Sequence, residues 1–521
     1  MKKNLLCLLL ALALIFGFAA CSCGDATPED VETTAPADVD TTAATEEPPV
    51  EPTKTFKESL EAIDGVVSVE EIEFYGETPY YSERYLVTFE QPLDWNDPSK
   101  GTFPQRVTVE VSEGAGINVM ETYGYCLMDY IYPNINILGM DEYFIPEMAN
   151  LVTSSGNYIN VEHRFFGGSR PADMTNTDTK YWEYNTPENA ANDYHKIYSS
   201  LAPLLCDRWV SVGTSRGGLM TNVYAKYFPN DMDVYIAYVA PCSDGFDGTN
   251  MYDFVYNEIG NTTYGEELAK KYRDNVTAVQ VKLIKEKEAL LSSFISALEQ
   301  RGVTFHEGFD DYGSLYDLAV LEFAVQIWQA GQSYLSSLWE LLEMPEGTSG
   351  ERMQKLDNIF SLLIGVQNPS DWAYSSAAWP YYSDGAMYYG QYLYDFSYLR
   401  AAMTEAGVDV NKLSVKPEDE KDIPWKIVFS DEQRAAFAYD GGAFRSELLD
   451  DMKTTTAKHL MIFGGSDPWR SQGVPEEATN GNDNIARYIN PNYTHDSKIS
   501  NMLDETKAEI LNLLKTWLAI D

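Results

Sequence analysis

The sequence predicts a protein of the α/β class, in which a parallel sheet is interrupted by a long, mainly helical insert. Short apolar runs such as 209–212 and 460–463 end in glycine-rich turns, which is typical of strands buried in a parallel sheet. The stretches 260–301 and 312–342 carry apolar residues at helical spacing and show no strand-like alternation. Their place between strand-like segments indicates an inserted helical domain.

The segment 213–217, with the sequence Gly-Thr-Ser-Arg-Gly, follows one of these apolar runs and precedes a helix-compatible stretch. A strand, a sharp turn and a helix with G-x-S-x-G at the turn are typical of the nucleophile elbow of an α/β-hydrolase. The flanking glycines leave room for the chain to reverse around an exposed serine. The pattern predicts an α/β-hydrolase core with an inserted, mainly helical cap, and Ser215 as its nucleophile.

The catalytic base is sought among the histidines of the chain, which are His163, His195, His306, His459 and His495. In this fold the acid and then the histidine follow the nucleophile along the chain, which excludes the first two. His306 lies in a polar turn between two helical patterns, and His459 begins an apolar run as a strand-edge residue. His495 lies in a turn-rich loop after the last strand-like segment, where the base of this fold is expected.

The acid of the triad is expected at the carboxyl end of a strand between Ser215 and His495. Asp467 fits this requirement, because the buried-strand run 460–463 ends at Gly464 and Gly465 and the carboxylate follows in the next loop. For the oxyanion hole, the fold supplies the backbone N–H of Arg216 and a second N–H from the loop after an earlier strand. Tyr125, preceded by Gly124, is the candidate for this second donor.

Several motifs together resemble one family. They are Glu-His-Arg-Phe-Phe-Gly at 162–167, the elbow with Gly218, Tyr-Phe-Pro at 227–229, Ala-Tyr-Val-Ala-Pro at 237–241, Phe-Glu-Gln-Pro at 89–92 ahead of Phe-Pro-Gln-Arg at 103–106, and Asp-Pro-Trp at 467–469. Over roughly residues 85–245 and 420–500 the chain resembles the secreted tripeptidyl aminopeptidase family of serine peptidases, a sister of the lysosomal prolyl carboxypeptidase group. The resemblance implies an α/β-hydrolase core with a helical cap, and a triad at Ser215, Asp467 and His495.

The resemblance also implies release of short peptides, tripeptides in this family, from free amino termini, with an acidic cap residue that holds the terminal amine. Asp371, Asp384 and Asp395 lie beside the Tyr- and Trp-rich end of the insert. We favour Asp384 for substrate binding because its neighbour Gly385 permits close approach. For His163 and Arg164 we expect structural roles, with the arginine paired to a carboxylate.

The amino end predicts export and a lipid anchor. Residues 1–20 have the basic start and short apolar core of a signal peptide, and Cys21 follows two alanines as in a bacterial lipobox. Residues 21–55 form an acidic segment rich in Thr and Pro, which cannot bury enough apolar surface to fold. We expect an extracytoplasmic lipoprotein that contacts the membrane through its lipid alone.

The remaining chain divides into a first core part at 56–243, the cap at 244–417 and a second core part at 418–521. The net charge of −43 makes nucleic acid an improbable partner and would attract a cationic peptide terminus. No metal and no cofactor are expected, since no zinc-type cysteine pair or phosphate-binding loop is present in the sequence. Among the cysteines, Cys126 with Cys242 is the pair whose geometry could allow a disulfide.

Two other functions stay open at this stage. An esterase or lipase would use the same elbow and triad, so these residues do not separate ester from peptide substrates. A non-catalytic lipoprotein that binds peptides is the other alternative, although a degenerate hydrolase would be expected to have lost one of the three residues.

Overall fold

The computed structural model describes residues 54–72, 80–127, 145–174, 179–243, 250–367, 388, 394–420, 423–435 and 439–520. Their strands form one sheet in the order β1-β2-β3-β5-β4-β6-β7-β8-β9. The strands are β1 (Val66–Glu71), β2 (Glu83–Pro92), β3 (Thr102–Val111), β4 (Asn118–Thr122), β5 (Asn157–Val161), β6 (Trp209–Thr214), β7 (Val234–Tyr238), β8 (His459–Gly464) and β9 (Ile485–Asn490). The sheet is antiparallel from β1 to β5 and parallel from β5 through β4 to β9. With helices on both faces, this is an α/β-hydrolase core.

The side chains of the parallel strands alternate between two apolar layers. In β8, Leu460 and Ile462 face one cluster, whereas Met461 and Phe463 face the other, as the two-residue period of a strand requires. The helices α5 (Pro187–Leu201), α6 (Arg216–Tyr227) and α18 (Ala443–Met452) cover one face, and α4 (Met148–Leu151) and α19 (Asp504–Trp517) cover the other. Burial on both faces explains why β7 and β8 are continuous, mostly apolar runs in the sequence.

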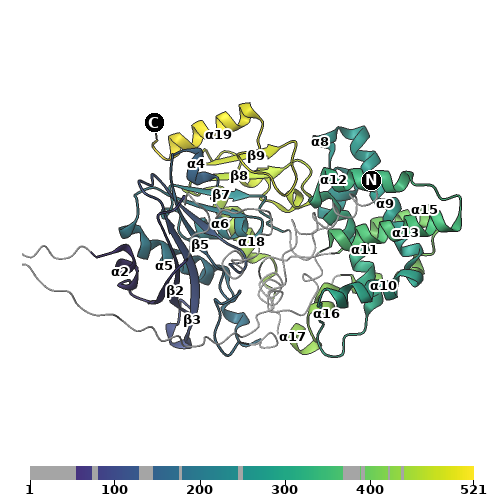
Figure 1. Cartoon of the computed structure of the whole chain (residues 1–521), viewed down its shortest axis with the longest axis horizontal. Coiled ribbons are helices and arrows are strands. Elements are labelled where there is room, and N and C mark those ends of the chain that lie inside the picture. The colour runs from purple at the N-terminus through teal and green to yellow at the C-terminus, as the bar shows by residue number, and fades with distance from the viewer. Residues whose placement is uncertain are drawn as a thin grey trace, which may run out of the picture.

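Between β7 and β8 the described residues form helices and no strand. These helices are α7 (Asn250–Asn257), α8 (Asn261–Tyr264), α9 (Glu266–Lys285), α10 (Lys287–Gln300), α11 (Tyr312–Ala330), α12 (Gln332–Glu343), α13 (Ser349–Val366), α15 (Ser397–Glu405), α16 (Ile423–Val428) and α17 (Asp431–Ala435), followed by α18 of the core. Most of them enclose an apolar cluster of their own, beside the sheet (Figure 1). The structure therefore has the helical cap, while its limits at residues 244 and 417 stay predictions.

Helix α11 is the central element of this cap. Asp311 caps its start by accepting a hydrogen bond of 3.0 Å from the Ser314 N–H. Gly331, at a φ of 89°, ends it, because this backbone conformation suits glycine and cannot continue a helix. Within the described part of the chain, we find no helix with the length and apolarity needed to cross a bilayer.

The disulfide considered for Cys126 and Cys242 does not form. Both are buried, and no disulfide joins them. Cys126 packs with Phe166, whereas Cys242 belongs to the apolar cluster on the α6 face of the sheet. Cys206, the third described cysteine, is not in a disulfide either.

His459 is a buried structural residue at the start of β8. It is fully buried, stacks on Tyr235 with ring centroids 5.5 Å apart, and neither ring nitrogen has a hydrogen-bond partner. Because burial penalises the charged imidazolium, it lowers the pKa of His459 to about 4. The expectation that His459 is not the catalytic base agrees with this environment.

This buried imidazole makes the stability of the fold depend on pH. Since the folded pKa of about 4 lies below the unfolded value of about 6.5, the unfolded chain binds the proton first. The folded state therefore loses stability as pH falls from about 6.5 toward 4, by on the order of 3 kcal/mol at most. Glu322 in the cap has the opposite effect, because burial raises its pKa to about 7 and protonation then favours folding. We predict that His459→Leu removes the destabilisation by acid that His459 causes.

The measurement is urea unfolding of wild type and His459→Leu at pH 7.5, 6 and 5. The difference in unfolding free energy between the two proteins should shift in favour of the variant as the pH falls. A difference that stays constant across the three pH values would contradict this assignment.

Candidate active site

Ser215 lies at a strained turn between β6 and α6. Its φ of 56° and ψ of −123° are unfavourable for a residue with a side chain. The turn is held by the Ser215 N–H, which donates a hydrogen bond of 2.8 Å to the Tyr238 carbonyl at the end of β7. A Cβ atom on Gly213 would lie 2.1 Å from the Gly217 carbonyl oxygen, so the close turn requires glycine there. The segment has the geometry of a nucleophile elbow.

Asp467 and His495 are joined by a hydrogen bond. His495 Nδ1 lies 2.9 Å from Asp467 Oδ2, and the Asp467 carboxylate is completely buried. The second oxygen, Oδ1, accepts a 3.0 Å hydrogen bond from the Trp469 N–H at the start of the short helix η8 (Pro468–Gln472). With Nδ1 bound to the carboxylate, Nε2 of His495 is the nitrogen left to accept a proton.

The three predicted triad residues lie at the same edge of the sheet. Gly213 in β6 is in register with Ala237 in β7, Ala237 with Met461 in β8, and Met461 with Arg487 in β9. Ser215 follows β6, Asp467 follows β8 and His495 follows β9, so all three come from the carboxyl ends of parallel strands. The Ser215 hydroxyl and the His495 ring are not hydrogen-bonded to each other in this structure. In free enzymes this bond is often long and tightens when substrate binds.

The loop after β4 packs directly on the nucleophile turn. A Cβ atom on Gly124 would lie 2.8 Å from the backbone nitrogen of Gly217, and the Arg216 guanidinium donates a 2.8 Å hydrogen bond from Nε to the Gly124 carbonyl. Thr122, at the end of β4, donates to the Gly217 carbonyl at 3.0 Å. The loop predicted to supply the second oxyanion donor thus lies beside the first turn of α6, as the assignment of the Tyr125 and Arg216 N–H groups requires.

The Glu-His-Arg segment after β5 supports this loop rather than reacting. Arg164 is fully buried and holds both carboxylate oxygens of Asp193, at 2.7 and 2.8 Å. Glu162 accepts the Leu127 N–H at 2.9 Å and is paired in bidentate fashion with Arg106. The His163 N–H donates to the Tyr125 carbonyl at 3.2 Å. These contacts give the structural role expected for Arg164 and tie the end of β5 to residues 125–127.

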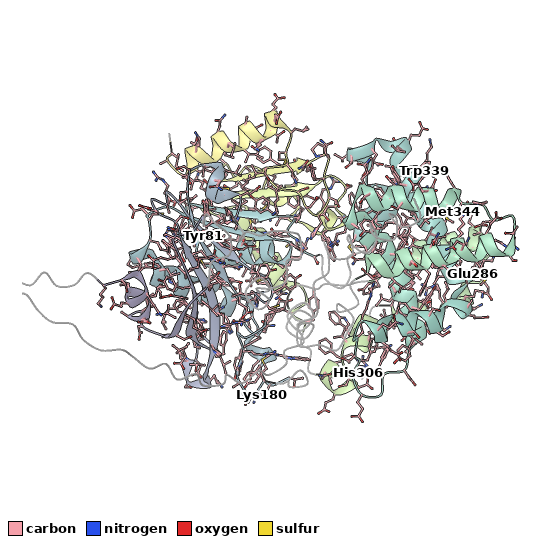
Figure 2. The ribbon with its side chains drawn as sticks, in the orientation of Figure 1. Tyr81, Lys180, Glu286, His306, Trp339 and Met344 are labelled. Atoms are coloured by element: carbon pink, nitrogen blue, oxygen red, sulfur yellow. The ribbon has the colours of Figure 1, made fainter. Side chains whose placement is uncertain are left out.

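His163 lies close behind the same loop but is unsuited to proton transfer. Its ring is buried against the edge of Phe166. Burial, assisted by the neighbouring Arg216 guanidinium, keeps the pKa of His163 well below its ordinary value. His306 is also set apart, since its Nε2 contacts the Lys426 carbonyl of α16 at 3.0 Å on the cap (Figure 2).

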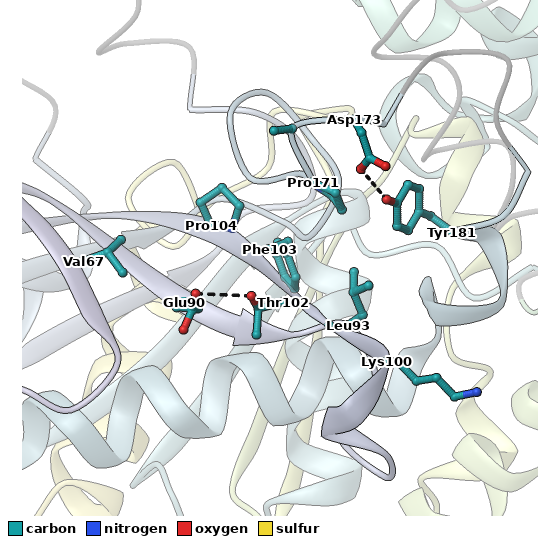
Figure 3. A pocket seen from close by; sticks show the side chains of 12 residues that line it. Val67, Glu90, Leu93, Lys100, Thr102, Phe103, Pro104, Pro171, Asp173 and Tyr181 are labelled. Carbon is teal, nitrogen blue, oxygen red and sulfur yellow. Dashed lines mark hydrogen bonds between the residues drawn. The ribbon is translucent and has the colours of Figure 1, made fainter.

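A separate cleft of about 410 Å³ lies at the antiparallel side of the sheet. Its walls include Leu93, Phe103, Pro104 and Tyr181, and Figure 3 shows Glu90 hydrogen-bonded to Thr102 at its rim. None of the predicted triad residues lines this cleft. It is therefore not where the chemistry of Ser215 would occur.

The cap contacts the loops that carry Asp467 and His495. Trp469 donates from its indole nitrogen to Gln329 Oε1 of α11 at 2.7 Å, and the Thr494 hydroxyl lies 2.9 Å from the Trp328 carbonyl of the same helix. These contacts between the cap and the two loops were not predicted from the sequence. An apolar helix gives no signal of which distant loop its last turn will meet.

Of the acids considered for amine binding, Asp371 and Asp384 lie outside the described residues. Asp395 is described, and its Oδ1 accepts the Ser397 N–H at 2.8 Å. The assignment of Asp384 stays a prediction. Cys21 likewise lies outside the described residues. The described residues contain no group of three histidine, cysteine, aspartate or glutamate side chains arranged to hold a metal ion.

Comparison with known proteins places this geometry in a family. The model of the PS-10 peptidase S37 family matches residues 55–345, more than half of the chain. A prolyl tri/tetrapeptidyl aminopeptidase of Streptomyces mobaraensis is 24% identical over 462 residues, covering 88% of this chain and 85% of that protein.

Similar solved structures have much lower sequence identity. A proline iminopeptidase of Mycobacterium smegmatis, at 12% identity and a TM-score of 0.33, covers 82% of this chain and 98% of its own. The esterase LipA of Xanthomonas oryzae, at 9% identity and a TM-score of 0.37, covers 88% and 99%. The family match spans the elbow and the cap helices from α7 to α12. Because it covers more than half of the chain, the chain belongs to the peptidase S37 family of serine peptidases.

Proposed function

We propose that this protein is an extracytoplasmic serine exopeptidase that releases short peptides, tripeptides in particular, from free amino termini. The observation that carries the proposal is the buried hydrogen bond between Asp467 and His495 at the sheet edge where Ser215 forms the elbow. Family membership favours peptides over the esters of an esterase or lipase, and the presence of all three residues disfavours a non-catalytic binding protein.

In the proposed mechanism, Ser215 Oγ attacks the scissile carbonyl and its proton passes to His495 Nε2. Asp467 holds the imidazole by Nδ1 and stabilises its positive charge. The oxyanion accepts hydrogen bonds from the N–H groups of Arg216 and Tyr125. His495 then protonates the leaving amine, and the amino-terminal peptide remains as an ester on Ser215. Water, deprotonated by His495, cleaves this ester and releases the short peptide.

Ser215 is the nucleophile of the proposed mechanism. Ser215→Ala should abolish labelling by a fluorophosphonate probe and lower peptide turnover by several orders of magnitude, because the variant lacks the oxygen that would form the acyl-enzyme. Mass spectrometry of the labelled protein is the measurement. Retention of the label in the variant would show that another serine reacts.

Exopeptidase action requires a group that binds the substrate's terminal ammonium group at a fixed distance from Ser215. A carboxylate does this through a charge-assisted hydrogen bond. Asp384 remains our predicted candidate, and Glu322 is a second one within the described residues. Glu322 is buried in α11 and accepts hydrogen bonds from the Tyr252 hydroxyl at 3.2 Å and the Gln326 amide at 3.3 Å.

The position of Glu322 along α11 suits a tripeptide. Glu322, Gln326 and Gln329 lie on one face of an otherwise mostly apolar helix, and Gln329 contacts Trp469 beside Asp467. Seven residues of helix rise by about 10 Å, which is also roughly the span of three extended residues. A peptide with its amine at Glu322 would thus place its third carbonyl near the catalytic loops.

We predict that removal of the carboxylate that binds the terminal ammonium group abolishes the preference for substrates with a free amino terminus. Wild type should cleave a tripeptide-coumarin substrate about ten to a hundredfold faster than its N-acetylated form. Glu322→Gln and Asp384→Asn are measured side by side. In the variant that lacks the binding carboxylate, the rate on the free substrate should fall to about the rate on the acetylated substrate. The rate on the acetylated substrate should stay as in wild type. Equal rates in wild type would show that no amine is read and would favour an endopeptidase or esterase.

The pH dependence separates the two carboxylates further. Burial raises the pKa of Glu322 to about 7. Below this pH the side chain is mostly protonated and has no negative charge with which to bind the substrate's ammonium group. The ratio of kcat/KM for the free and acetylated substrates should therefore fall below about pH 7 if Glu322 is the reader. Taking the ratio cancels any effect of pH that acts equally on both substrates.

We also propose that Cys21 carries lipid and that the acidic segment 21–55 tethers the enzyme outside the cytoplasm. The acyl chains would anchor the protein, because each CH₂ group buried in the membrane contributes about 0.8 kcal/mol of binding free energy. Repulsion between like charges would keep the tether extended. We predict that Cys21→Ala lowers the mass of the mature protein by its lipid and releases it from the membrane fraction. Unchanged mass and unchanged membrane retention would contradict lipidation.

A further inference from the structure

The loops that carry Asp467 and His495 form a single clasped unit. The Gly465 N–H donates to the Asn490 carbonyl at 2.7 Å, and the Ser466 N–H donates to the Tyr493 carbonyl at 3.3 Å. A Cβ atom on Gly464 would lie 2.1 Å from the Thr494 carbonyl oxygen. The two backbones are therefore in direct contact, and a shift of one loop must move the other.

This clasped unit meets the last turn of cap helix α11 at two polar contacts. The Thr494 hydroxyl lies 2.9 Å from the Trp328 carbonyl and 3.0 Å from the Ser466 carbonyl, so its single hydrogen is shared between the helix and the Asp467 loop. The Trp469 indole donates to Gln329 at 2.7 Å. Thr494 precedes His495 in the chain, and Trp469 is two residues from Asp467. Each contact is thus within two residues of a proposed catalytic group.

The end of α11 is shaped for this contact. Carbonyls in the last turn of a helix lack partners within the helix, and the Trp328 carbonyl accepts both the Gly331 N–H at 3.2 Å and the Thr494 hydroxyl. A Cβ atom on Gly331 would lie 3.5 Å from Thr494 Cγ2, so the helix stops against this residue. The carbonyl end of α11 is also the negative end of its dipole, and it lies beside the residue preceding the base that becomes positively charged.

We propose that Thr494 and Gln329 are positioning residues, through which the last turn of α11 sets the positions of His495 and Asp467. The cap would then be part of the catalytic apparatus as well as a cover over it. This inference rests on the proposed triad. It extends the role of the cap, since the helix that carries Glu322 also holds the catalytic loops.

The chemical basis is the narrow tolerance of proton transfer. A displacement of about 1 Å in a catalytic group can lower the rate by about a hundredfold. A partial displacement of His495 and Asp467 should therefore lower the rate of attack by Ser215 without a comparable change in substrate binding. This effect differs from a loss of stability, which would lower the amount of active enzyme.

The test uses Thr494→Val, which keeps the shape of the side chain and removes the donor, and Thr494→Ser, which keeps the donor. Gln329→Met removes the acceptor for Trp469. Thr277→Val is the matched control, because this threonine donates to a carbonyl within α9, at 3.0 Å from Arg273, and does not contact the catalytic loops. The readouts are the rate of fluorophosphonate labelling, kcat and KM for a tripeptide-coumarin substrate, and the thermal midpoint.

We expect Thr494→Val and Gln329→Met to lower the labelling rate and kcat at least tenfold, with KM changed less than twofold. Thr494→Ser and Thr277→Val should stay within twofold of wild type. Wild-type rates in both Thr494→Val and Gln329→Met would overturn the proposal, as would a Thr494→Ser variant as slow as Thr494→Val. If Thr494→Val fails to fold, Gln329→Met decides the outcome, because its part-exposed side chain is less important for packing.

Labelling keeps this proposal separate from the proposed function. If wild type is labelled at Ser215 but cleaves no peptide, the exopeptidase function fails and the positioning test is still read from the labelling rate. If Ser215→Ala is labelled as wild type is, the triad is wrong and the positioning role falls with it.

Discussion

The parallel register of β6, β7, β8 and β9 is the constraint on which the candidate site depends. Because Gly213, Ala237, Met461 and Arg487 lie in one row across the sheet, the loops that follow these strands begin at the same edge. Ser215, Asp467 and His495 are far apart in the sequence, and this register brings their loops to the same edge. The buried bond from Asp467 to His495 is its most direct result.

Close backbone contact then makes these loops rigid. Where Gly213 meets Gly217 and where Gly464 meets Thr494, a Cβ atom would lie 2.1 Å from a carbonyl oxygen. Such separations are possible only without a side chain. They allow a nucleophile turn and a clasped pair of loops to be held by hydrogen bonds and packing instead of by long side chains. Rigid support of this kind is what a preorganised catalytic site requires.

Charged groups away from the triad have a supporting role. The bidentate pairs of Arg164 with Asp193 and of Arg106 with Glu162 anchor the segment after β5, and Glu162 also binds the loop beside the elbow. In the cap, the buried pair of Lys287 with Asp317 joins α10 to α11. The Glu-His-Arg motif thus binds the loop at residues 125–127, which is the loop proposed to supply an oxyanion donor.

The sequence by itself predicted the fold class and the strained serine turn, and it pointed to Asp467 and His495 as the proposed partners of Ser215, because each of these depends on local patterns. Buried strands appear as apolar runs, a nucleophile elbow needs glycines at fixed offsets, and few histidines follow Ser215. It left open a disulfide between Cys126 and Cys242, which the structure does not contain. Only the tertiary structure decided that Thr494, Trp469 and α11 meet, that Glu322 lies buried on the face leading to them, and that His163 is enclosed behind the loop of Gly124 and Tyr125. These contacts join residues separated by long stretches of chain, and they depend on how the cap packs on the sheet, which no local pattern encodes.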